Sequence, residues 1–113
     1  MRRPATQGQN EFLPELVQQI VEAVQPFRIV LFGSAARGHL QPETDIDLLV
    51  VMPEGTHRRR TAQHLYRTIS GAKVPFDLVV ATSGDLERRR DNIRLIYRAV
   101  IEEGRIIYAA PRT

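Results

Sequence analysis

Three short runs of β-branched and aromatic residues most constrain what this chain of 113 residues can fold into. They are residues 27–32, 45–52 and 74–81, and each is bounded by proline, glycine or polar residues. Runs of this length and composition are typical of strands. The segments before, between and after them are long enough for helices, so we expect a sheet with helices packed against it.

The remaining segments show helical patterns. Residues 13–24 have apolar side chains along one helix face, with Pro14 in the first turn and Pro26 as the stop. Thr56 is the expected cap of a second helix, whose apolar face carries Ala62, Leu65, Tyr66 and Ile69.

Near the C-terminus, Thr82 and Asp85 form the pattern of a capping box before a long third helix. Gly104 ends that helix, and residues 105–108 are expected to form a short last strand. The predicted order is α-β-β-α-β-α-β. The expected fold class is therefore α/β (α+β), with a small mixed β-sheet flanked by helices.

Length and composition narrow the class of protein. We expect residues 1–10 to be a flexible tail and residues 11–110 to be a single domain. Cysteine is absent from the sequence, which excludes disulfides and thiolate metal sites. No apolar run approaches the roughly 18 residues of a membrane span, and residues 1–8 lack the apolar stretch of a signal peptide. We expect a cytoplasmic protein without a membrane partner.

The basic charge is almost entirely arginine. Net charge is +3, Lys73 is the single lysine, and arginine triplets occur at residues 58–60 and 88–90. Arginine suits contact with phosphate or carboxylate, so an acidic partner or nucleic acid is one interpretation. The other is that both triplets are solvated helix faces. We favour the second, because the charge excess is modest and no aromatic residue interleaves with the triplets, so nucleic acid is not the expected partner.

Three acids are expected to meet at one edge of the sheet. If residues 27–32 and 45–52 pair antiparallel, the first strand ends where the second begins. Asp45 and Asp47 then share a face, with Cα atoms about 6.5 Å apart. The third strand follows a helical crossover and is expected to lie parallel to the second. Asp77, near its start, can therefore join the other two acids. Carboxylates placed in this way can ligate divalent ions, and Mg²⁺ prefers such oxygens.

Gly33 and Ser34 follow the first strand at the same predicted edge. Glycine lets backbone N–H groups approach a phosphate, and the serine hydroxyl can donate to a phosphate oxygen. A Gly-Ser turn, an Asp-x-Asp pair or a single buried acid is by itself usually structural. Their combination at one edge is far more specific.

At these residues the sequence resembles the nucleotidyltransferase superfamily that includes DNA polymerase beta, and within it the minimal nucleotidyltransferase domains. The family motif is Gly-Ser, ten residues and Asp-x-Asp, which here is Gly33-Ser34, residues 35–44 and Asp45-Ile46-Asp47. Three further parts of the sequence are similar to the same family. They are the apolar runs on either side of the motif, residues Pro75 to Val79 around the third acid, and the ending Ala99 to Tyr108. The resemblance covers about residues 12–108.

The resemblance implies a polymerase beta-like nucleotidyltransferase fold and specific residue roles. Asp45, Asp47 and Asp77 would be catalytic and would bind metal, as two Mg²⁺ ions, with Mn²⁺ as an alternative. Gly33 and Ser34 would bind the triphosphate of ATP or another NTP. Arg37 matches a frequently basic position that can touch phosphate. Ala35 departs from relatives that carry a larger basic or aromatic residue at this position.

The same resemblance bears on partners. Many short proteins of this kind are antitoxins beside a HEPN-domain ribonuclease toxin, and some inactivate it by adding AMP to a tyrosine. We therefore expect a protein adenylyltransferase that acts on a HEPN toxin. Two alternatives stay open: neutralisation of the toxin by binding alone, and nucleotidyl transfer to a small molecule or RNA. The base preference, the acceptor and the oligomeric state are left open, and a homo-oligomer is compatible with the sequence.

Overall fold

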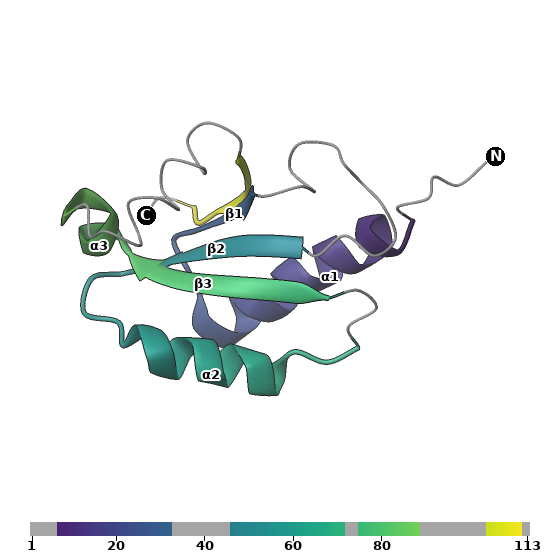
Figure 1. Ribbon diagram of the computed structural model, residues 1–113, viewed down its shortest axis with the longest axis horizontal. Coiled ribbons are helices and arrows are strands. Elements are labelled where there is room, and N and C mark those ends of the chain that lie inside the picture. Colours follow the sequence, from purple (N-terminus) through teal and green to yellow (C-terminus); the bar gives the residue numbers. More distant parts are fainter. Residues whose placement is uncertain (1–6, 33–45, 72–74, 89–103, 112–113) are drawn as a thin grey trace.

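The computed structural model describes residues 7–32, 46–71, 75–88 and 104–111 (Figure 1). The helices and strands follow the predicted order. They are α1 (Gln7–Val24), β1 (Arg28–Phe32), β2 (Ile46–Met52), α2 (Arg58–Thr68), β3 (Phe76–Thr82), α3 (Ser83–Arg88) and β4 (Arg105–Ala109).

The strands form one four-stranded mixed sheet in the order β3-β2-β1-β4. β1 is antiparallel to β2 and to β4, and a register shift interrupts the second pairing between Ile29 and Val30. β2 and β3 are parallel, and α2 lies in the connection between them. Both strand directions predicted from the sequence, antiparallel for the first pair and parallel for the second, are confirmed, as is the mixed α/β fold class.

One face of the sheet is covered by α1 and α2. Side chains of alternate strand positions, among them Ile29, Leu48 and Val50, are buried there in one apolar cluster with α1 and α2. The helix side chains in that cluster are Phe12, Leu16, Ile20 and Leu65, all fully buried. Because strand side chains alternate between faces, the positions between these residues point to the opposite face.

The opposite face carries a smaller apolar cluster. It consists of Val30, Leu49, Val51 and Ala81, with Phe32 and Val79 packed against it. Asp47 lies between Ile46 and Leu48, two residues of the helix-covered cluster, so alternation places Asp47 on this second face. The sheet therefore separates a helix-packed side from the side that bears the acid.

The first helix begins earlier than the sequence pattern predicts. Residues 7–10, expected to belong to a flexible tail, form the first turn of α1, and Pro14 lies inside the helix rather than in its first turn. These polar residues provide no apolar periodicity, so a hydrophobic pattern cannot detect them as helical. At the other end, Val24 is followed by Gln25 with a φ of 50° and then by Pro26, which confirms the predicted stop.

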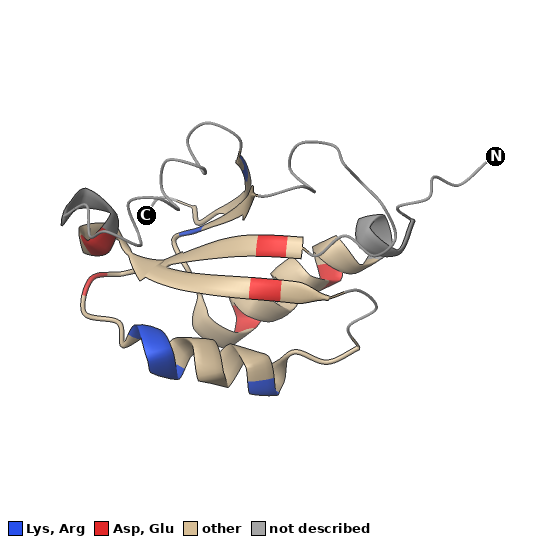
Figure 2. Cartoon of the chain, viewed as in Figure 1, with Lys and Arg blue, Asp and Glu red and all other residues tan. Residues whose placement is uncertain are grey.

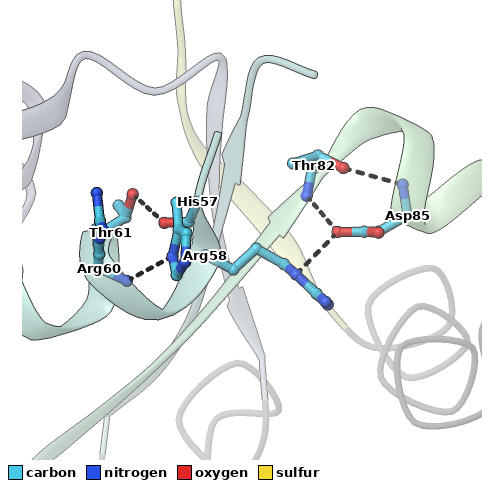
Figure 3. A network of polar contacts seen from close by, with 6 residues as sticks. All are labelled: His57, Arg58, Arg60, Thr61, Thr82 and Asp85. Carbon is cyan, nitrogen blue, oxygen red and sulfur yellow. Dashed lines mark hydrogen bonds and ion pairs between the residues drawn. The ribbon is translucent and has the colours of Figure 1, made fainter. Parts of the chain in front are cut away.

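The N-terminal ends of α2 and α3 are joined by a network of polar contacts (Figure 3). His57, rather than the predicted Thr56, caps α2: its Nδ1 accepts a hydrogen bond from the Arg60 N–H at 3.2 Å. The predicted capping box of α3 is confirmed. Thr82 Oγ1 accepts from the Asp85 N–H at 3.0 Å, and Asp85 Oδ2 accepts from the Thr82 N–H at 3.2 Å. Asp85 also pairs with Arg58 Nε at 3.3 Å, which ties the start of α2 to the start of α3.

The last described element is β4, which pairs with β1 and so forms the second edge of the sheet. The predicted continuation of the third helix beyond Arg88 lies outside the described residues. Among the helices that the structure describes, none is long and apolar enough to cross a membrane.

Candidate active site at the starts of β2 and β3

Asp47 is the second residue of β2 and has a neighbour on each side in the sheet. Its register partner on β1 is Phe32, the last residue of that strand. Its register partner on β3 is Asp77. Asp47 is half-buried and makes a polar interaction in addition to its strand pairing. The end of β1 and the starts of β2 and β3 therefore lie at one edge of the sheet, as predicted.

Asp77 is the second residue of β3 and is exposed. Neighbouring strands lie about 4.8 Å apart, and register partners on parallel strands point to the same face. The two acids are consequently side by side on the face opposite α1 and α2. Figure 2 shows acidic positions on both β2 and β3. Two carboxylates at this spacing repel each other unless a cation lies between them.

The remaining predicted site residues lie outside the described residues. These are Gly33, Ser34, Arg37 and Asp45. β1 ends at Phe32, directly before the Gly-Ser pair in sequence, and β2 begins at Ile46, directly after Asp45. The described strands thus bring Asp47 and Asp77 together. The roles of all six residues stay predictions.

The donor set fits a hard divalent cation. Asp47 and Asp77 offer carboxylate oxygens, the ligands that Mg²⁺ prefers, and the exposure of Asp77 leaves room for water and phosphate oxygens to complete the shell. Within the described part of the chain, no three acid or histidine side chains gather as a metal-binding group. The predicted third ligand, Asp45, is not among those residues.

The strand that carries Asp77 is fixed by contacts on two sides. The Pro75 carbonyl oxygen accepts a hydrogen bond from the Ile46 N–H at 3.0 Å, which joins the start of β3 to the start of β2. On the outer side, the Tyr66 hydroxyl of α2 accepts a hydrogen bond from the Leu78 N–H at 2.8 Å. The sequence pattern indicated Tyr66 only as a member of an apolar helix face. Its phenolic oxygen was the available signal, since tyrosine can accept a hydrogen bond where phenylalanine cannot.

A second polar region lies at the opposite end of the same strands. A cavity of about 600 Å³ has Thr56, His57, Arg58 and Arg59 in its described lining. The cavity adjoins the start of α2, which follows the end of β2, whereas the acids lie at the start of that strand. Met52 lies five positions after Asp47 along β2, which is about 16 Å at 3.3 Å per residue. This arginine-bearing region is therefore not part of the acid site.

Comparison with known proteins identifies the family and the fold of the chain. Residues 13–107 match the family model described as "Nucleotidyltransferase domain". The fold is similar to that of a Sulfolobus solfataricus protein assigned as a nucleotidyltransferase. That match has a TM-score of 0.64 and 20% identity, and covers 96% of this chain and 90% of the other.

A second similar structure is a toxin–antitoxin complex crystallised with AMP-PNP. Its TM-score is 0.56 at 21% identity, with 85% of this chain and 73% of the other covered. No curated protein matches the sequence significantly.

The sheet places Asp47 and Asp77 at the starts of two parallel strands, beside the end of the antiparallel strand β1. The family match extends over most of the described sheet and helices. The chain belongs to the nucleotidyltransferase domain family.

Proposed function

We propose that this protein transfers AMP from ATP to a hydroxyl group of a partner protein, with Asp45, Asp47 and Asp77 as catalytic metal ligands. The observation that carries the proposal is the register pairing of Asp47 with Asp77 on adjacent parallel strands. We assign the activity to residues 11–110 and expect it in the cytoplasm, where ATP and Mg²⁺ are abundant.

The proposed reaction is an in-line displacement at the α-phosphorus. Two Mg²⁺ ions, when bound, would offset charge on the attacking and leaving oxygens. The acceptor oxygen forms a new bond to the α-phosphorus, the bond to the bridging α–β oxygen breaks, and pyrophosphate leaves. Asp77, the more exposed of the two described acids, takes the proton of the acceptor hydroxyl. Asp47 lies half-buried between its register partners Phe32 and Asp77. Its proposed role is that of a metal ligand on the side of the site that holds the triphosphate.

Gly33, Ser34 and Arg37 are proposed to hold the triphosphate. A glycine at the end of β1 would allow backbone N–H groups to approach phosphate, and Ser34 would donate its hydroxyl. Arg37 would add a charge-assisted contact. The end of β1 at the same sheet edge as the acids supports this division of roles.

The acceptor is proposed to be a tyrosine of a HEPN-type toxin. Support comes from the similarity to a toxin–antitoxin complex that holds an ATP analogue, together with the sequence resemblance to antitoxins of this kind. A docked partner surface would also shield the reacting groups from water. Neutralisation by binding alone is the competing mechanism, and transfer to a small molecule or RNA is a third.

Co-expression with the protein encoded beside it tests the acceptor. Mass spectrometry of the partner should show AMP increments on a tyrosine when the wild-type chain is present and none with Asp47→Asn. The matched control is Glu15→Gln, which removes an exposed acid from α1 on the other side of the sheet. An unmodified partner that Asp47→Asn still neutralises fully would contradict transfer and favour binding alone.

A further inference from the structure

Tyr66 of α2 contacts both chain neighbours of Asp77. Its ring stacks on the ring of Phe76, with centroids 5.7 Å apart and planes 13° from parallel. Its hydroxyl accepts a hydrogen bond from the Leu78 N–H at 2.8 Å. Phe76 and Leu78 belong to the helix-covered side of the sheet, and alternation places Asp77 between them on the other side.

The contact with Leu78 is made along the outer side of β3, where no further strand of the described sheet pairs with it. β3 is the outermost strand, with β2 as its single neighbour in the described sheet. Unpaired amides of an edge strand are otherwise left to water or to another chain. The Leu78 N–H is instead bonded to α2. The Tyr66 hydroxyl therefore supplies, at this position, the hydrogen-bond acceptor that a further strand would supply.

Phe76 is held from a second direction as well. The ring of Phe12 from α1 lies 6.2 Å from it, tilted by 54°. Three aromatic rings thus join α1, β3 and α2 on the face of the sheet opposite Asp77. They are Phe12, Phe76 and Tyr66. A strand end at the edge of a sheet frays readily, and these contacts restrain it at the residue where a carboxylate has to be placed accurately.

We propose that Tyr66 is a positioning residue for nucleotidyl transfer, which acts through the backbone of Asp77 without touching the substrate. The inference rests on the proposed function, because it assumes that Asp77 works beside the acceptor hydroxyl. Small displacements of reacting groups lower rates far more than they lower ground-state binding. Loss of the Tyr66 hydroxyl should therefore lower turnover and leave the binding of the nucleotide nearly unchanged.

Tyr66→Phe tests the inference, because it removes the hydroxyl and keeps the ring that stacks on Phe76. The matched control is Tyr108→Phe on β4, at the opposite edge of the sheet. Turnover is measured with α-labelled ATP, Mg²⁺ and, as acceptor, the unmodified partner obtained by co-expression with the Asp47→Asn chain. With Tyr66→Phe it should fall about tenfold, with the KM for ATP within about twofold of wild type. The Tyr108→Phe variant should stay near wild type in both.

Amide hydrogen exchange gives a readout that does not need activity. In Tyr66→Phe the Leu78 N–H loses its acceptor and should exchange at least about tenfold faster, while amides of β1 stay protected. An active wild type with full turnover in Tyr66→Phe overturns the positioning role. An equal loss of turnover in both variants also overturns it, since that indicates general destabilisation. A wild-type chain that transfers no label, even with the partner, contradicts the proposed function itself.

Discussion

Asp47 and Asp77 differ in environment although they are register partners. Asp47 is half-buried between two strands, and Asp77 is exposed on an edge strand. A half-buried carboxylate is held by its surroundings and suits a fixed ligand, whereas an exposed one is open to an incoming acceptor. The separate roles proposed for the two acids follow from this difference.

Replacing either acid by its amide should nearly abolish transfer. Asp47→Asn and Asp77→Asn each remove one charged oxygen ligand and keep the side-chain shape. We expect turnover to fall at least about a hundredfold, because charge stabilisation through a bound metal contributes several kcal/mol to the transition state. Release of pyrophosphate from ATP in the presence of the partner measures the effect.

The control for charge alone is Glu15→Gln, which should keep wild-type turnover. The folded state of Asp77→Asn should be as stable as wild type in EDTA, or slightly more stable, since one of two neighbouring like charges is gone. Undiminished transfer by the Asp47→Asn, Asp77→Asn double variant would show that these acids are not the catalytic ligands.

The strands were predictable from the sequence because apolar β-branched runs such as residues 46–52 encode both their type and their position. The placement of Asp77 at the same end of the sheet as Asp47 followed from one topological rule, that a helical crossover joins parallel strands. Their exact register did not follow from the sequence. The start of α1 was not predictable from periodicity, since residues 7–10 are polar. The hydrogen bond from the Leu78 N–H to Tyr66 was also not predictable, because it depends on which strand is the outermost one of the sheet.

His57 is an uncommon N-cap, and its effect on α2 can be measured. Its Nδ1 satisfies the Arg60 N–H, one of the donors left unpaired at a helix start. His57→Ala should lower the free energy of unfolding by about 1 kcal/mol. His57→Asn, which supplies a favoured capping side chain, should stay at or above wild type. Urea denaturation measures both, and equal stability of the alanine variant would show that the cap contributes nothing.

Asp85 joins α3 to α2 and should contribute more than a single cap. Its carboxylate accepts from the Thr82 N–H and pairs with Arg58 while only 8% of its side chain is exposed. Asp85→Ala should lower the free energy of unfolding by about 2 kcal/mol. Asp85→Asn keeps an acceptor and loses the ion pair, so its loss should be smaller. If both variants unfold at the same urea concentration as wild type, the network is not stabilising.

Across the whole domain, stability and chemistry are divided between the two faces of the sheet. The side packed by α1 and α2 holds the larger buried cluster, and the acids lie on the other side. A ligand at the acid edge can therefore bind without disturbing the main core. Such a ligand should therefore raise the stability of the folded state mainly because it binds the folded and not the unfolded chain.

ATP should stabilise the protein only together with a divalent ion. Bare triphosphate is repelled by the acid pair, and Mg²⁺ or Mn²⁺ can bridge the two. At a ligand concentration of 100 times Kd the gain is about 2.7 kcal/mol, so Tm should rise by several degrees with MgATP. ATP in EDTA should leave Tm unchanged, and an equal rise in EDTA would place the nucleotide away from the acids.

A crystal structure with Mn²⁺ and a non-hydrolysable ATP analogue tests the proposed site most directly. We expect anomalous density for Mn²⁺ between the Asp47 and Asp77 carboxylates, with Mn–O distances of about 2.0–2.2 Å, close to those that Mg²⁺ adopts. The triphosphate should lie at the edge where β1 ends. Mn²⁺ and nucleotide bound elsewhere, for example in the cavity beside Arg58 and Arg59, with Asp47 and Asp77 left without metal, would contradict the assignment.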